Sequence, residues 1–152
     1  MDYIVTVKSA SPVRLAAVRV TVPAMGIASA WKPALDKVWA FLRTHPIPNS
    51  GHNVFLYHHP SIPGEAMEID FGVQVLNWFE GEAEVRYVES PEGEVAETLH
   101  TGQYSRLGEA HAAIRQWCQA HQRPLGKHSW EVYGHWNIDP DKLQTSIYYL
   151  LA

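Results

Sequence analysis

The second half of the sequence follows the plan of the first half after a shift of 76 residues, and this internal repeat constrains the fold more than any other feature. The shift places segment 54–57 (VFLY) on 130–133 (WEVY), and segment 67–71 on 143–147. At a slightly larger offset, Pro46 and Ile47 fall on Pro124 and Leu125. Few residues are identical, but the order of elements is the same. We therefore predict one domain over 1–152, a common domain size, with repeats of about 1–76 and 77–152.

Each repeat shows the pattern of two strands, a helix and two more strands. Apolar residues at steps of three and four predict one helix from Ile27 to Leu42 and another from Ala110 to Cys118, with Ser105 as its N-cap. The expected class is α+β, with an antiparallel eight-stranded sheet and both helices on one face. Alternating apolar positions predict these strands: 3–8, 15–22, 53–58, 67–75, 85–89, 95–100, 130–136 and 143–151.

Composition and charge exclude several classes of protein. The formal net charge is −4 without any run of Lys or Arg, and no segment ahead of Tyr3 could form a helix-turn-helix, so we expect no direct DNA binding. Cys118 is alone and cannot form an internal disulfide. No signal peptide or stretch of membrane-spanning length is present, so we expect a cytoplasmic protein that does not enter a membrane.

The sequence contains no familiar motif for a metal or cofactor. The nine His residues lack the short spacings of metal ligands, and we interpret them as surface or hydrogen-bonded side chains. There is no Gly-x-Ser-x-Gly elbow and no glycine-rich phosphate loop. We predict no metal and no cofactor.

Strand alternation divides the aligned residues into two faces. We expect the apolar phase to lie under the helices and to form the core with Trp39 and Trp117. That phase contains Val54, Leu56, Trp130 and Val132, whereas the other contains Phe55, Tyr57, His59, Glu131, Tyr133 and His135.

Glu131 is the unusual member of the second phase, because burying a carboxylate among aromatic rings is costly without a positive or donor partner. It either recognises a cationic or donor-rich ligand between aromatic walls, or it is an exposed residue on a solvated face. The pattern of residues alone leaves both interpretations open. The six Trp and seven Tyr residues suit a ligand pocket, since they combine large flat surfaces with polar groups.

Several short motifs, in order, resemble the GyrI-like (gyrase-inhibitor-like) family, which includes the effector-binding domains of multidrug-responsive transcription regulators. In the first half, segment 67–73 (MEIDFGV) resembles the fourth strand of that family. In the second half the motifs are 97–104 (ETLHTGQY), a helix, Gly126, 130–133 (WEVY), Asp139-Pro140 and 143–145 (LQT). The resemblance covers essentially the whole chain.

This resemblance implies a ligand cleft between the two halves, with an acidic residue in the strand after the second helix. Glu131 falls on that position, and Tyr133, Tyr57, Phe55 and Trp136 are the expected aromatic walls. Tyr104 either lines the cleft or plugs the structure locally, and Tyr148 reaches either the cleft or the surface.

Three functions remain open at this point. The first is a stand-alone protein that binds lipophilic, aromatic or cationic small molecules, for sequestration or sensing. The second, implied by stand-alone members of the family, is a hydrolase that opens the cyclopropane rings of DNA-alkylating natural products. Glu131 would then act on water, and Tyr133 or Tyr57 would donate a proton. The third is a protein-interaction module, such as a gyrase modulator.

Overall fold

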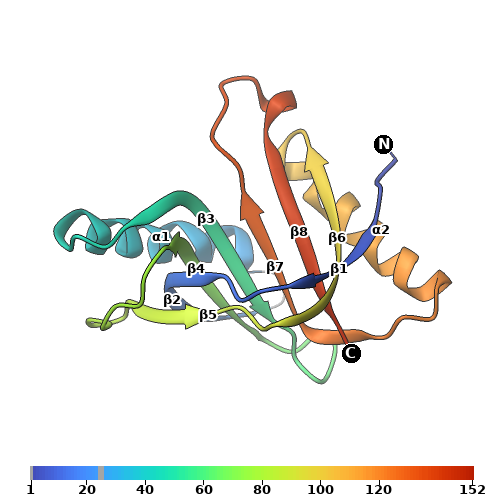
Figure 1. Ribbon diagram of the computed structural model, residues 1–152, viewed down its shortest axis with the longest axis horizontal. Coiled ribbons are helices and arrows are strands. Elements are labelled where there is room, and N and C mark those ends of the chain that lie inside the picture. The colour runs from blue at the N-terminus through green and yellow to red at the C-terminus, as the bar shows by residue number, and fades with distance from the viewer. Residues whose placement is uncertain (1, 24–25) are drawn as a thin grey trace.

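A computed structural model describes residues 2–23 and 26–152. Both helices, α1 (Ile27–Thr44) and α2 (Leu107–Ala120), lie on the same face of one antiparallel sheet (Figure 1). The eight strands run in the order β1-β6-β8-β7-β3-β4-β2-β5. Their bounds are β1 Thr6–Ala10, β2 Arg14–Val22, β3 Asn49–His58, β4 Met67–Val75, β5 Arg86–Glu89, β6 Gly93–Thr101, β7 Leu125–Tyr133 and β8 Gln144–Leu151. The predicted fold class is confirmed.

Two predicted boundaries are wrong. Strand β7 ends at Tyr133, so that Trp136 lies in the loop that follows the strand. Ser105 is not the N-cap of α2, because it lies inside a short 3-10 turn, Tyr104–Arg106, and the helix begins after that turn.

The repeat of 76 residues is clearest at the two helix ends. Helix α1 ends at Thr44 and α2 ends at Ala120, and a histidine follows each helix. His45 Nδ1 donates to the carbonyl oxygen of Phe41 at 2.9 Å, and His121 Nδ1 donates to that of Trp117 at 2.8 Å. Each imidazole also stacks on the aromatic ring four residues earlier, with ring centroids 4.0 Å apart in both cases.

The first strand of each repeat pairs with the opposite half of the molecule, which the sequence did not predict. Strand β1 pairs with β6, and β5 pairs with β2. The chain therefore crosses between the halves twice, before β2 and before β6 (Figure 1). The two crossings are joined by hydrogen bonds, since Ser90 N donates to Val13 O at 2.9 Å and Val13 N donates to Ser90 Oγ at 2.7 Å.

The sequence-based assignment of the two faces is inverted. Phe55 and Tyr57 lie on the helix side, where they join the core cluster of α1. Cys118 is buried under α2 as expected, in a second cluster. The predicted helix-side residues form a third cluster on the other face, and its members are Leu15, Ala17, Val54, Leu56, Val95 and Trp130, with Val132 packed against it.

Three residues predicted to be fully buried are only partly so. Val132 lies at the margin of the third cluster, and Trp39 and Trp117 pack against the helix-side clusters. Trp39 keeps its indole at the edge of the core, where Nε1 donates to Asn53 Oδ1 at 3.0 Å. Among the described residues, neither helix is both long and apolar enough to cross a membrane.

Candidate functional site

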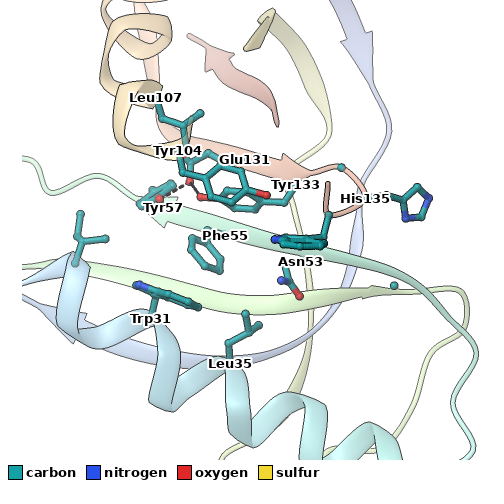
Figure 2. Close-up of a pocket in the computed structure, with 14 residues that line it drawn as sticks. Trp31, Leu35, Asn53, Phe55, Tyr57, Tyr104, Leu107, Glu131, Tyr133 and His135 are labelled. Carbon is teal, nitrogen blue, oxygen red and sulfur yellow. Dashed lines mark hydrogen bonds between the residues drawn. The ribbon is translucent and has the colours of Figure 1, made fainter. Parts of the chain in front are cut away.

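A cavity of about 640 Å³ lies between the two helices, above the central strands β3 and β7 (Figure 2). One wall comes from α1 and includes Trp31 and Leu35, and the other comes from Tyr104 and Leu107 at the start of α2. The side chains of Phe55, Tyr57, Glu131 and Tyr133 form its base. Six of the seven residues singled out from the sequence line this cavity: Phe55, Tyr57, Tyr104, Glu131, Tyr133 and Trp136.

Tyr148 is the exception, and the structure corrects its placement. Its neighbours Ile147 and Tyr149 point toward α2, so strand alternation turns Tyr148 to the opposite face. There its ring stacks on Trp130 with centroids 5.7 Å apart, and Lys8 Nζ lies 5.5 Å from its centroid.

Glu131 is buried at the base of the cavity with only 4% of its surface exposed. Its Oε1 accepts a hydrogen bond from Tyr57 Oη at 2.5 Å and a second from Tyr133 Oη at 2.8 Å. Its Oε2 lies 2.6 Å from His111 Nε2 on α2. Three side chains from three elements therefore hold the carboxylate in one orientation.

A second set of contacts lies behind His111. His111 Nδ1 is 2.7 Å from Tyr149 Oη, and the same oxygen accepts from Arg115 Nη1 at 3.1 Å. Because His111 has two ring nitrogens with separate partners, it links Glu131 to a guanidinium that is one helical turn further along α2.

Burial raises the pKa of both Tyr57 and Tyr133 well above the usual value for a phenol, and the nearby Glu131 carboxylate acts in the same direction. Both hydroxyls therefore remain protonated at neutral pH. They act as hydrogen-bond donors toward the carboxylate.

The two repeats contribute chemically different walls to the cavity. Positions 76 residues apart are structurally equivalent, and strand pairing places Phe55 directly opposite Glu131. On the first repeat the equivalent positions hold Leu35, Phe55 and Val73, whereas the second repeat has His111, Glu131 and Tyr149. The cavity therefore has an apolar half and a hydrogen-bonding, acidic half.

Sequence reasoning missed His111, Tyr149 and Trp31. His111 was grouped with the other scattered histidines, although the repeat places it opposite Leu35, where a polar residue in an apolar position was a usable signal. Trp31 was placed on the apolar stripe of α1, but its indole borders the cavity, with its ring centroid 6.4 Å from that of Phe55.

The donors at this site do not form a metal-binding group. In the part of the chain that the structure describes, no three His, Cys, Asp or Glu side chains are grouped as a metal ion would require. The arrangement suits a hydrogen-bonded carboxylate that faces an aromatic cavity.

A family model for the GyrI-like small molecule binding domain matches residues 4–151. The chain belongs to the GyrI-like family. No curated protein matches this GyrI-like sequence at a significant level.

Solved structures share the fold of this GyrI-like domain. The C-terminal domain of EcmrR has a TM-score of 0.80 and 19% sequence identity, with 100% of this chain and 99% of that chain covered. The structure of SAV2435 bound to tetraphenylphosphonium has a TM-score of 0.74 and 15% identity, with 100% and 94% covered. A hydrolase from Listeria innocua has a TM-score of 0.63 and 12% identity, with 97% and 91% covered. At these identities the likeness concerns the fold alone.

Proposed function

We propose that this GyrI-like domain binds small aromatic molecules that carry a positive charge, and that it acts by sequestering or sensing them. The observation that carries this proposal is the buried Glu131 carboxylate at the base of an aromatic cavity. A carboxylate attracts a cation more strongly in such surroundings than in water, because the local dielectric constant is lower.

The contacts of Glu131 support binding of a whole cationic molecule. The Tyr57 and Tyr133 hydroxyls and His111 satisfy its oxygens, so the carboxylate remains stable in the empty cavity. The apolar half of the cavity, with Trp31, Leu35 and Phe55, offers a surface for a flat or bulky hydrophobic body. A positive charge over an aromatic face contributes about 0.5–2 kcal/mol more.

The neighbour SAV2435 supports the choice of ligand class, because its structure contains tetraphenylphosphonium, a lipophilic aromatic cation. That compound is also a suitable probe here. Its charge is permanent and does not depend on pH.

The test compares the wild type with Glu131→Gln for binding of tetraphenylphosphonium and of neutral triphenylphosphine oxide. The Gln side chain keeps the shape, and His111 can accept from the new amide by changing tautomer, so the fold should persist. We expect tetraphenylphosphonium affinity to fall at least tenfold, about 1.4 kcal/mol, and affinity for the neutral compound to stay within a few-fold. Equal losses for both compounds, or no loss for either, would contradict a charge-based role for Glu131.

A hydrolase is the second candidate, and one observation favours it: a carboxylate and two protonated phenols meet at one point of the cavity. In this reaction Glu131 accepts a proton from water while the water oxygen bonds to a cyclopropane carbon. The ring C–C bond breaks, its electron pair moves onto a conjugated carbonyl, and Tyr133 or Tyr57 protonates that oxygen. The net change is the addition of one water molecule.

Mass spectrometry distinguishes this reaction from binding. A hydrolase converts a cyclopropane-bearing alkylator to a product heavier by one water, and Glu131→Gln should slow that conversion on the order of a hundredfold or more. Recovery of the unaltered alkylator from the wild type, at a rate equal to that in buffer, would exclude this candidate.

A further inference from the structure

We propose that His111 determines which ligand charge the cavity accepts, because the proton on its imidazole and a cationic ligand compete for the same Glu131 carboxylate. This inference rests on the proposed cation binding. It identifies the residue that tunes this binding and the condition under which binding is lost.

The geometry places His111 between the carboxylate and the rest of α2. Its Nε2 lies 2.6 Å from Glu131 Oε2, and both side chains are largely buried. The equivalent position in the first repeat is Leu35, which packs in the core of α1. An apolar residue is therefore compatible with this place in the fold, so the imidazole is not required to complete the helix-sheet packing.

In the neutral state of His111, the second set of contacts is fully satisfied. Nε2–H donates to Glu131, Tyr149 Oη donates to Nδ1, and Arg115 donates to the Tyr149 oxygen. Each of these donors has one acceptor, and the pair of His111 and Glu131 carries a net charge of −1. A cation entering the cavity neutralises that charge.

In the protonated state both imidazole nitrogens are donors. The imidazolium then neutralises Glu131 and leaves no net charge for a ligand to pair with. The same proton also makes Nδ1 donate to the Tyr149 oxygen that already accepts from Arg115, which brings two cations against one hydroxyl. Contacts with Glu131 favour the charged imidazole and contacts near Arg115 oppose it, so a change in occupancy of the cavity can alter its charge.

The charged and titratable groups around His111 come from four elements. Glu131 on β7 and Tyr149 on β8 contact it directly, Arg115 lies on its own helix, and Tyr57 on β3 meets its ring edge with centroids 6.5 Å apart. His59, also on β3, stacks on Tyr149 with centroids 6.0 Å apart and bonds to Ser129. Burial lowers the pKa of His59, and the nearby His111 adds to that effect.

Binding and protonation are linked reciprocally. A cation that binds better to the neutral form of His111 releases a proton when it binds to the protonated form. Its affinity must then fall as the pH drops through the range in which histidine gains charge, about pH 8 to 5. For one linked proton, the limit is about tenfold in affinity per pH unit.

The experiment is calorimetric titration of the full chain with tetraphenylphosphonium at about pH 8 and about pH 5.5, in two buffers with different ionisation enthalpies. The dependence of the observed heat on the buffer gives the number of protons released, and the ligand itself cannot contribute any. We expect wild-type affinity to fall by about tenfold or more at the lower pH, with proton release near the midpoint.

Two variants assign this effect to His111. Gln at position 111 can donate to Glu131 but does not titrate, so His111→Gln should bind tetraphenylphosphonium equally at both pH values without proton release. His59→Gln is the matched control, because His59 lies in the same region without contacting Glu131, and this variant should behave as the wild type. Thermal melts at both pH values check that each variant is folded, and His111→Leu, which copies the first repeat, provides a second non-titrating variant.

The outcomes separate this inference from the proposed function. If the wild type binds tetraphenylphosphonium with equal affinity at both pH values, or if His111→Gln still releases a proton, His111 does not have this role and the cation-binding function stands. If the wild type does not bind the cation at either pH, the proposed function is wrong, and the role of His111 is excluded with it.

Discussion

Phe55 and Glu131 are paired directly across strands β3 and β7, and each holds in its own repeat the position that the other holds in the second repeat. The approximate two-fold axis of the molecule therefore passes between them. Tyr57 and Tyr133 are also equivalent under this axis, and both donate to the same carboxylate oxygen. The fold is symmetric at this point while the chemistry is not, and one buried charge is held by a symmetric pair of phenols.

The two phenols should therefore stabilise Glu131 in a mutually dependent way. In Tyr57→Phe or Tyr133→Phe, Oε1 keeps one donor, so each single change should cost about 1–2 kcal/mol in the free energy of unfolding. The double variant leaves Oε1 with no donor and should cost more than the sum of the two. Urea melts of all four proteins measure this coupling, and additivity within about 0.5 kcal/mol would show that the phenols act independently.

Asp70 should make the protein less stable in acid. Burial acts to raise the pKa of this carboxyl, which is 1% exposed, but hydrogen bonds from His58 at 2.6 Å and from Arg19 at 2.9 Å outweigh burial and lower the pKa below its usual value. A lowered pKa means that the stabilisation is present above the unfolded-state pKa, near 4, and is lost as the pH falls through the lower folded-state pKa.

The matched variant for this effect is Asp70→Asn, which should cost about 2 kcal/mol at neutral pH because it removes the charge that Arg19 and His58 contact. Its stability deficit relative to the wild type should shrink between about pH 4 and pH 2. A deficit that stays constant over that interval in denaturant melts would show that ionisation of Asp70 does not contribute.

Trp136 and Trp78 form a natural pair for testing the cavity. Their exposed fractions are 75% and 69%, but only Trp136 lines the cavity, whereas Trp78 lies beside Tyr87. Replacing either one with Ala should change stability by no more than about 0.5 kcal/mol. Trp136→Ala should weaken tetraphenylphosphonium binding about tenfold through lost stacking, and Trp78→Ala should leave binding unchanged. Titration by quenching of intrinsic fluorescence can follow both, and equal affinities would place the ligand away from the β7–β8 loop.

Helix α2 should tolerate loss of its tryptophan better than loss of a smaller residue. Ile114 has no exposed surface, so Ile114→Ala should cost about 2–5 kcal/mol. Trp117 is only partly buried and stacks on His121 at the helix end, so Trp117→Ala should cost less than the roughly 3–5 kcal/mol of a buried tryptophan. Guanidinium melts give both values, and the reverse ranking would mean that the helix packs through its other side.

The elements of the fold were largely readable from the sequence, but their faces were not. Hydrophobic periodicity identified the eight strands, both helices and the repeat, because each depends on local spacing. The central strands are apolar on both faces, with Phe55 under the helices and Val54 and Leu56 in the opposite cluster. Alternation separates a buried face from a solvated one, and it cannot decide between two buried faces.

The candidate site was predictable where it follows the strand register. Glu131, Tyr133, Phe55 and Tyr57 share one phase and line one cavity. His111 was not predictable in the same way, because its contact with Glu131 depends on how α2 lies over the sheet. Tyr148 was ambiguous because two tyrosines are adjacent in β8, and only the burial of Tyr149 decides which one faces the helices.

The exchange of first strands between the halves has a consequence for synthesis of the chain. Strand β1 leaves the ribosome early, but its pairing partner β6 lies nearly 90 residues later, with Thr6 opposite Glu97. Until then, the edge of β2 that pairs with β5 is also uncovered. A nascent chain that contains only the first repeat therefore has one strand without a partner and one open sheet edge, the exposed features that chaperones bind and that lead to aggregation. Folding must wait for the second repeat, so the two halves acquire their stability together.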